Sequence, residues 1–286
     1  MKLQYDCYNC IFKMAFAISR ETSEDEKKQS AVLREMMDYL VKNGEKVVPP
    51  EVTLNLHGIY KRETGLFDPY FEVKKKSTEL GLELLDELRT LVKNSPAPLE
   101  TAIKLAIGGN IIDYGVYPDF KLEEAKKEVL KVLDMEFDRN SLDDLIRRIQ
   151  SAKQIFYVLD NCGEAVLDRL VLEQIPCKVI VGVRGEPSLN DVTRKDAIES
   201  GITDFEIVDT GNGASGVLLD LIPEDFKNAL YNSDLVITKG LGNFESLEED
   251  FKETPLYFLF RVKCPVVAKH INVPLHSMQV LGYNLD

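Results

Sequence analysis

The feature that most constrains the fold of this chain is a series of short apolar segments that alternate with helical patterns after residue 150. Segments that are apolar at nearly every position are typical of strands buried on both faces, which occur in parallel sheets flanked by helices. The sequence therefore predicts an α/β fold with a doubly wound, mainly parallel sheet. The predicted strands are QIFYVLD (154–160), CKVIVGVRG (177–185), FEIVDTG (205–211), SDLVITKG (233–240), PLYFLFRVKC (255–264) and PVVAKHINV (265–273).

The first half of the chain has a helical pattern instead. Apolar residues recur at helical spacing in four stretches, which are residues 10–19, 27–43, 69–94 and 98–115. Prolines separate the stretches, including the pair Pro49-Pro50 and a short break at residues 95–98. A chain of 286 residues is long enough for two domains. We expect a mainly helical N-terminal domain over residues 1–150 and a Rossmann-like α/β domain over residues 151–286.

Charge and composition argue against several classes of protein. The net charge of −13, with no block of Lys or Arg, argues against a nucleic-acid partner. No apolar run approaches the roughly 20 residues needed to span a bilayer, and the first residues lack the apolar core of a secretion signal. Five cysteines is an odd number, and a chain of this size does not need disulfides. We expect a cytoplasmic protein without a membrane partner; the sequence does not reveal its oligomeric state.

Polar side chains gather at the predicted carboxyl ends of four strands, the edge at which ligands bind in open α/β sheets. They are Asp160-Asn161, Asn190-Asp191, Asp209-Thr210-Gly211 and Lys239-Gly240. Carboxylate and amide oxygens suit Mg²⁺ or Mn²⁺, so Asp160, Asn161 and Asp191 are candidate metal ligands. The alternative is helix capping, because Asn and Asp are favoured N-caps and Asp191 with Thr193 would begin a helix well. Two adjacent loops that both carry an Asn/Asp pair favour the metal site.

The segment TKGLGNFES (238–246) favours a phosphate pocket. Gly240 and Gly242 allow the backbone to approach a ligand closely, and Lys239 supplies a mobile cation. The alternative is a glycine-rich turn beside a solvated lysine. The segment TGNGASG (210–216) could likewise bind phosphate or be only a turn, and it lacks the spacing of a P-loop nucleotide site.

Several motifs together resemble a known family. DNCGEAVLDRL (160–170), GEPSLNDVT (185–193) and KGLGNFE (239–245) resemble the DUF89 family, the metal-dependent damage-control phosphatases with an ARMT1-like fold. CYNC (7–10), FDPYFEVKKKSTELGLELL (67–85) and AIGGNIIDYG (106–115) are similar to the same family, especially its microbial branch with an N-terminal CxxC. The resemblance extends from about Cys7 to about His270.

The resemblance implies a phosphatase of small phosphomonoesters, such as sugar phosphates or damaged phosphorylated metabolites. It implies a divalent metal (Mg, Mn, Co or Ni) bound by Asp160, Asn161 and Asp191, the same three residues that the strand ends indicate. It also implies a substrate pocket whose residues are Lys239, Gly240, Gly242 and Asn243, with Asn110 and Asp113 approaching from the helical part.

The expected chemistry is attack on phosphorus by a metal-activated water. Lys239 would neutralise charge on the phosphoryl oxygens. Glu164 would act as a base or an orienting group, unless it is only a carboxylate on the helix surface. A covalent aspartyl-phosphate at Asp160 is the alternative, but Cys162 stands where the haloacid dehalogenase phosphatases carry a second Asp.

Two other functions and one further motif stay open. The same cleft could bind metal and a phosphorylated metabolite without catalysis, or the sheet could bind S-adenosylmethionine in a methyltransferase that needs no metal. Cys7 and Cys10 form half of a zinc site or a redox pair, or are simply two packed cysteines. His57, His270 and His276 form no zinc-binding motif, so a hydrolase built on histidine ligands is disfavoured.

Overall fold

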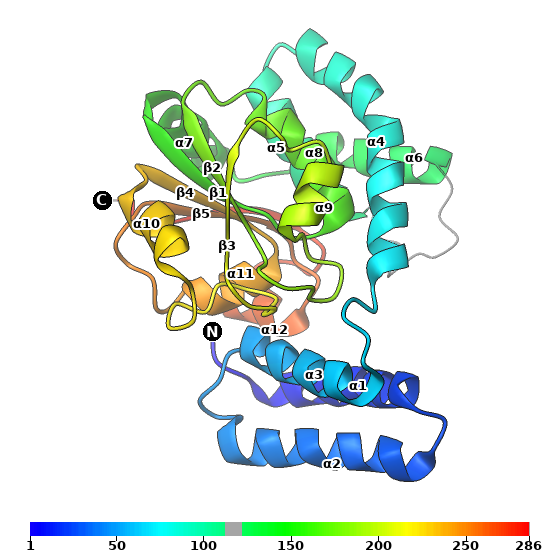
Figure 1. The fold of residues 1–286 in the computed structure, drawn as a ribbon. Coiled ribbons are helices and arrows are strands. Elements are labelled where there is room, and N and C mark those ends of the chain that lie inside the picture. The colour runs from blue at the N-terminus through cyan, green and yellow to red at the C-terminus, as the bar shows by residue number, and fades with distance from the viewer. Residues whose placement is uncertain (112–121, 286) are drawn as a thin grey trace.

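One sheet organises the second half of the chain. The protein structure is a computed structural model that describes residues 1–111 and 122–285. The described residues form a six-stranded sheet in the order β3-β2-β1-β4-β5-β6 (Figure 1). Strands β1 to β5 pair in parallel and β6 pairs antiparallel with β5, which confirms the predicted mainly parallel sheet. The strands are β1 (Gln154–Val158), β2 (Lys178–Val183), β3 (Glu206–Asp209), β4 (Leu235–Lys239), β5 (Leu256–Arg261) and β6 (Met278–Tyr283).

The helices before the sheet begin at the caps and prolines that the sequence supplies. Asp25 and Asp138 cap α2 and α7 through their side chains. Pro49 and Pro98 occupy the first turn of α3 and α5, where the missing N–H costs nothing. These helices are α1 (Tyr5–Thr22), α2 (Glu26–Asn43), α3 (Pro49–Thr64), α4 (Phe71–Asn94), α5 (Pro98–Gly108), the 3₁₀ turn η1 (Gly109–Ile111), α6 (Leu122–Lys131), η2 (Val132–Asp134) and α7 (Arg139–Ser151).

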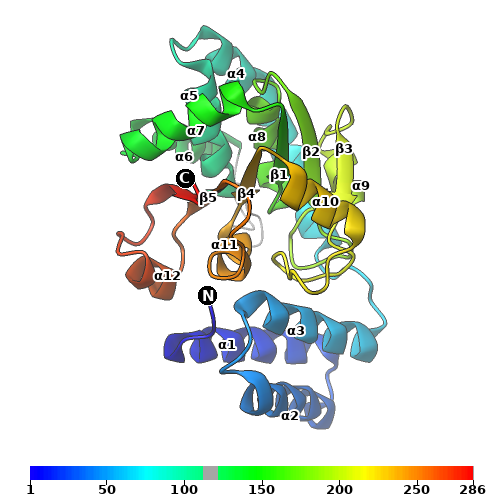
Figure 2. The same ribbon diagram turned by 90° about the vertical axis from the view of Figure 1, so that its left-hand side faces the viewer.

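Helices cover both faces of the sheet, as a doubly wound fold requires. Successive side chains of a strand point to opposite faces, so Ile155 and Tyr157 of β1 pack with α4, α5, α7 and α8, while Phe156 and Val158 pack with α10 and α11 (Figure 2). Both sets are buried, which explains why the strands are apolar throughout. The helices after β1 are α8 (Cys162–Leu172), α9 (Arg194–Glu199), α10 (Glu224–Asn232), α11 (Leu241–Leu247) and α12 (Pro265–His270).

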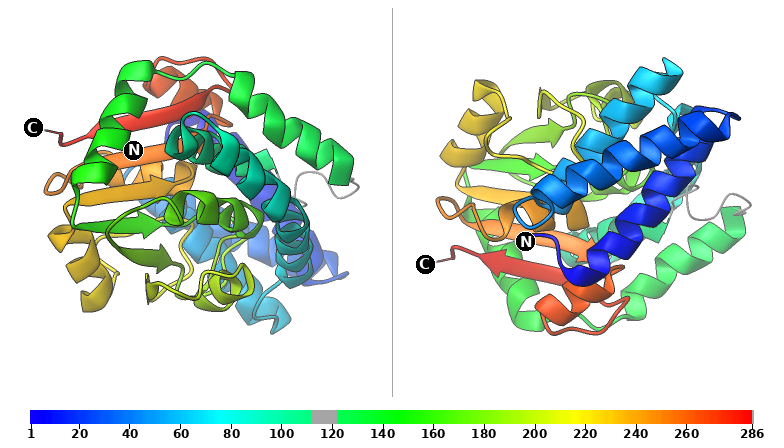
Figure 3. Two further views of the ribbon diagram at one scale, coloured as in Figure 1. Left: turned by 90° about the horizontal axis from the view of Figure 1, so that it is seen from above. Right: turned by 90° about the horizontal axis from the view of Figure 1, so that it is seen from below.

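Helices α1–α3 form a separate group. Their buried residues, among them Ala15, Met36 and Leu56, make a hydrophobic cluster of their own, whereas α4–α7 share a cluster with the sheet. Seen from below, α1 and α3 lie across the carboxyl edge of the sheet (Figure 3). The helical pattern continues to residue 151, but hydrophobic packing changes earlier, between α3 and α4.

One predicted strand is wrong. Residues 265–270 of PVVAKHINV form α12, and the last strand is β6, farther along the chain. Pro265 stands in the first turn of α12 and lacks the N–H that a central strand would need. The strand that follows β5 is therefore delayed until Met278, and it turns back antiparallel along β5.

Two helical glycines lead to a prediction about stability. A Cβ on Gly81 of α4 would lie 2.9 Å from the Cβ of Val166 and 3.1 Å from the carbonyl oxygen of Gly163, both in α8. A Cβ on Gly58 of α3 would meet no heavy atom of the described residues within 4 Å. We expect Gly81→Ala to lower the free energy of unfolding by about 1 kcal/mol, because overpacking outweighs the gain in helix propensity. Gly58→Ala should raise it by up to about 1 kcal/mol.

Urea denaturation followed by circular dichroism measures both effects. Equal changes in the two variants would contradict the close approach of α4 and α8.

Candidate functional site

A cavity of about 210 Å³ lies at the carboxyl ends of the parallel strands. The strand order reverses between β1 and β4, and ligands of open α/β sheets bind at such a reversal. Its lining comes from η1, from the segments after β1 to β4, and from the end of β5. The polar residues that line it include Asn110, Asp160, Asn161, Asn190, Asp191 and Ser215. The cavity therefore brings together the three predicted metal ligands and three predicted substrate residues, Asn110, Gly240 and Gly242.

Larger hollows among the described residues are lined by helices and loops away from the strand ends. The largest groove by the α1–α3 group, about 490 Å³, lies between α2, α3 and residues Leu218 and Leu221. Its Arg62 forms two hydrogen bonds with Glu35, at 3.0 and 2.6 Å, so these charges are bound to each other. We therefore place the functional site at the strand ends.

The two loops that carry the acidic residues are joined through their backbones. Asn161 and Asp191 form an isolated antiparallel β-bridge, and the amide of Val192 donates to the carbonyl of Asp160 at 2.8 Å. Asn161 is the N-cap of α8 by position, but its side chain makes no capping hydrogen bond. Thr193 caps α9 in a reciprocal pair with Asp196. Capping therefore does not account for the side chains of Asn161 and Asp191.

Both acidic side chains are buried close to each other. Burial raises the pKa of the Asp160 carboxyl well above its usual value, and the neighbouring Asp191 carboxylate raises it further. Burial also raises the pKa of Asp191, against the opposing effect of Arg184. The carboxylate of Asp160 accepts no hydrogen bond from the described residues, and its nearest cation is Arg184 Nη2 at 3.8 Å. Such a pair favours a bound cation.

Arg184 is a residue beside the candidate site that the sequence analysis missed. It follows β2 directly and its side chain is only 1% exposed. Its Nε donates to Asp191 Oδ2 at 2.7 Å and its Nη1 to Asn243 Oδ1 at 3.0 Å. Nη2 is buried without a hydrogen-bond partner among the described residues. The first polar residue after the apolar run of β2 could have revealed it.

The structure does not place Lys239 in the lining of the cavity, where the sequence analysis expected it to meet phosphate. Lys239 is the last residue of β4 and is fully buried. Its Nζ donates to Glu164 Oε1, to Asp168 Oδ1 at 2.8 Å and to the carbonyl of Ala106 at 3.1 Å. An ammonium with three acceptors is not a mobile cation that meets substrate.

Glu164 is not a surface carboxylate either, since it is 1% exposed. Besides Lys239 it binds Asn110, whose Nδ2 donates to Glu164 Oε2 at 2.9 Å. Asn110 Oδ1 is buried and has no hydrogen-bond partner among the described residues. Since Asn110 also lines the cavity, this oxygen is an acceptor available to a ligand.

The other predicted substrate residues differ in position. Gly240 and Gly242 line the cavity, and Gly240 has φ +79°, with the carboxylate of Asp160 only 2.0 Å from where its Cβ would lie. Asn243 is fully buried; it accepts from Arg184 and donates to the carbonyl of Lys239 at 2.7 Å, so it joins strand ends instead of lining the cavity. Asp113 lies outside the described residues.

Two cationic residues lie at the cavity near the end of β5. Arg261 and Lys263 both line the cavity. The Nε of Arg261 is buried without a hydrogen-bond partner among the described residues. Lys263 is exposed, and its charge counteracts the rise in the pKa of Asp160. The charged end of PLYFLFRVKC carried this information, although the sequence analysis used only its apolar part.

The donors at this cavity fit a hard cation through oxygen atoms. Over residues 1–111 and 122–285, no three His, Cys, Asp or Glu side chains are grouped so as to hold a metal. The available set is two carboxylates, Asp160 and Asp191, with the amide oxygen of Asn161 or Asn190. Oxygen sets of this kind suit Mg²⁺ and Mn²⁺, which keep several waters.

Comparisons with known proteins agree on one family. The family model described as the damage-control phosphatase ARMT1-like domain matches residues 3–278. An uncharacterized protein of Methanocaldococcus jannaschii is 32% identical over 286 residues, covering 96% of this chain and 93% of that protein. A damage-control phosphatase of Pyrococcus horikoshii is 31% identical over 281 residues, covering 96% of each.

A solved structure is similar over the whole chain. It is the crystal structure of a DUF89 family protein from Pyrococcus horikoshii at 2.04 Å resolution. Its TM-score is 0.87 and its sequence identity 29%, with 98% of this chain and 99% of that chain covered.

The buried ion cluster below the cavity yields a prediction. We expect Lys239→Met to lower the free energy of unfolding by about 3–5 kcal/mol, because it leaves two buried carboxylates unpaired. Lys178→Met, the same change at an exposed lysine paired with Glu206, should cost less than about 1 kcal/mol. Denaturant titrations of the two variants measure the difference; similar costs would contradict the buried pairing.

The same variants should differ in pH dependence. Burial raises the pKa of Asp168 to about 6, above its usual value. Ionisation of this carboxyl therefore lowers the stability of the folded protein at pH values above about 6. It has no such effect at pH values below the usual pKa of Asp, where the carboxyl is protonated in both the folded and the unfolded protein. Without Lys239 this cost grows. The deficit of Lys239→Met should therefore be larger at pH 8 than at pH 5, whereas that of Lys178→Met should stay constant.

Proposed function

Because the chain belongs to the damage-control phosphatase ARMT1-like domain family, we propose that it is a divalent-metal-dependent phosphatase of small phosphorylated metabolites. The observation that carries the proposal is the composition of the cavity at the strand ends. Asp160 and Asp191 supply a buried pair of carboxylates, and Arg261 and Lys263 supply cations in the same cavity. A phosphoester and a divalent cation are the ligands that such opposite charges would hold together.

In this proposal the cation is held by oxygen atoms of Asp160, Asp191 and Asn161. When bound, a divalent cation supplies Lewis acidity and lowers the pKa of the attacking water. Arg184 holds Asp191 in place through its hydrogen bond and partly balances the charge of the acidic pair. Mg, Mn, Co and Ni all remain candidates, because oxygen ligands tolerate each of them.

Arg261 and Lys263 would bind the phosphoryl oxygens, in the role first expected for Lys239. A water oxygen forms the new bond to phosphorus, the bond to the ester oxygen breaks, and an alcohol and inorganic phosphate leave. We assign the attack to water and not to Asp160, because Asp160 serves as a cation ligand and its neighbour two residues on is Cys162. Asn110 Oδ1 would accept a hydrogen bond from a hydroxyl group of the substrate.

Glu164 acts here through Asn110 and is not a base. Both its oxygens are already bound, one to Lys239 and one to Asn110. It therefore orients the Asn110 amide so that Oδ1 remains available to the cavity.

The assignment to one branch of the family and the cellular location of the protein rest on the sequence. The microbial branch with an N-terminal CxxC is supported by Cys7 and Cys10, both in α1, where Cys7 is buried and Cys10 exposed. None of the described helices is long and apolar enough to cross a membrane. A cytoplasmic location and the absence of a nucleic-acid partner stay predictions.

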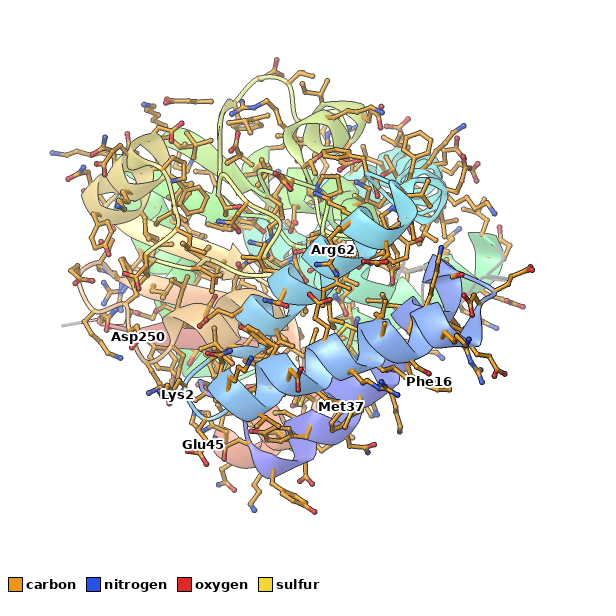
Figure 4. All side chains as sticks on the ribbon, turned by 60° about the horizontal axis from the view of Figure 1, so that its bottom comes forward. Lys2, Phe16, Met37, Glu45, Arg62 and Asp250 are labelled. Atoms are coloured by element: carbon orange, nitrogen blue, oxygen red, sulfur yellow. The ribbon has the colours of Figure 1, made fainter. Side chains whose placement is uncertain are left out.

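The first prediction concerns the acidic pair. After removal of metal by a chelator and addition of each divalent cation in turn, wild type should release phosphate from p-nitrophenyl phosphate or a sugar phosphate. Asp160→Asn and Asp191→Asn should lose at least about 100-fold in kcat/KM, because several kcal/mol of charge stabilisation is removed and each 1.4 kcal/mol is about tenfold. Asp250→Asn, an exposed position labelled in Figure 4, is the matched control and should keep full activity.

Metal binding without phosphate release from any ester would count against catalysis and favour a binding protein. Binding of S-adenosylmethionine in the absence of metal would instead favour a methyltransferase.

The second prediction concerns the cations at the end of β5. Lys263→Gln should weaken the binding of inorganic phosphate, measured as product inhibition, by about fivefold, because an exposed charge pair contributes about 1 kcal/mol. Lys269→Gln in α12 removes an exposed lysine outside the cavity and should leave inhibition unchanged. An equal effect of both changes would show that only the overall charge matters.

A further inference from the structure

One face of α3 contacts two loops that line the cavity. Thr53, His57 and Lys61 are spaced four residues apart, so they lie along the same side of the helix. Each of the three side chains contacts a different residue in the loops that follow β2 and β3. The Thr53 and Ser215 hydroxyls are 2.8 Å apart, the amide of Leu189 donates to His57 Nε2 at 3.3 Å, and Lys61 Nζ lies 2.5 Å from Glu186 Oε2.

The residue that His57 binds has an unusual backbone. Leu189 has φ +48°, in the left-handed region that is unfavourable for a leucine. Its neighbours on the chain are Asn190 and Asp191, and all three line the cavity. The amide of Asp191 closes the same turn on the carbonyl of Ser188 at 2.9 Å. The backbone conformation of Leu189 therefore determines the position from which the Asp191 side chain extends.

His57 is well suited to hold this backbone and poorly suited to serve stability alone. It is 4% exposed, and burial lowers its pKa to about 4, so the ring is neutral and Nε2 can accept. Its proton is then on Nδ1, which is buried without a hydrogen-bond partner among the described residues. A buried donor without a partner destabilises the folded protein. An apolar residue would avoid that cost but could not bind the Leu189 amide.

We propose that His57 is a positioning residue, through which α3 holds the 186–191 loop so that Asp191 faces the cavity. The α1–α3 group is then a part of the site and not only an added helical layer. Figure 4, which brings α1–α3 forward, shows these helices in front of the loops beyond the sheet. The role in cation binding rests on the proposed function, whereas the role in holding the loop does not.

Three variants test the proposal. His57→Leu removes the acceptor, His57→Gln keeps an oxygen that can accept from the Leu189 amide, and Leu56→Ala is the control. Leu56 is the preceding residue of α3 and is fully buried in the separate α1–α3 cluster, so its truncation lowers the melting temperature without removing a contact to the loop.

Two measurements are made on each full-length variant. The first is amide hydrogen exchange in peptides covering residues 186–191 and 240–247 of the metal-free protein. The second is the dissociation constant for Mn²⁺ alone, by calorimetry. We expect His57→Leu to speed exchange in 186–191 but not in 240–247 and to weaken Mn²⁺ binding about tenfold. His57→Gln should restore both to within about threefold of wild type, and Leu56→Ala should lower the melting temperature while leaving both unchanged.

The outcomes separate the two proposals. Unchanged exchange in 186–191 for His57→Leu, or a change equal to that of Leu56→Ala, overturns the positioning role. If wild type itself binds no divalent cation, the proposed function fails, and exchange alone then decides whether His57 holds the loop.

Discussion

The buried ammonium of Lys239 is the interaction on which the arrangement of the site depends. It joins the end of β4 to α8 through Glu164 and Asp168, and to α5 through the carbonyl of Ala106. A buried charge must be paired, so these three elements can pack only in the geometry that brings all the acceptors to one nitrogen. Two carboxylates face one ammonium, and this excess of negative charge agrees with the raised pKa of Asp168. The cluster also contacts the cavity through Asn110. Glu164 accepts a hydrogen bond from the Asn110 amide and so orients it, and Asn110 Oδ1 has no hydrogen-bond partner among the described residues.

Much of the fold could be predicted because the strands here are buried on both faces. That burial leaves apolar residues at every position, and it made β1 to β5 visible in the sequence. The helix at Pro265 was missed because VVAKHINV has the composition of a strand, and only the position of the proline distinguishes the two. The separate hydrophobic cluster of α1–α3 could not be read from the sequence for another reason. It depends on which cluster each apolar face joins, and periodicity does not contain that information.

The parts of the site that depend only on which polar residues follow a strand could be predicted from the sequence. The parts that depend on the direction of a side chain could not. Asp160, Asn161 and Asp191 do meet at one cavity, as the shared edge of parallel strands requires. Lys239 stands at the same edge, but the last residue of a strand points to one face or the other, and here it points into the helices. Arg184 and His57 were missed because their roles come from contacts between segments far apart in the chain.

The positions of Arg184, Arg261 and Lys263 bear on how an anion would reach this molecule. The chain as a whole carries a net charge of −13, so a phosphate dianion meets a repulsive body at long range. At physiological ionic strength that repulsion fades beyond about 8 Å, and the cations at the cavity dominate only within a comparable distance. The approach of the anion is then neither steered nor strongly repelled, and its capture is local. An enzyme built in this way would not gather phosphorylated metabolites in general; it would retain those that have diffused into the cavity and that match its walls.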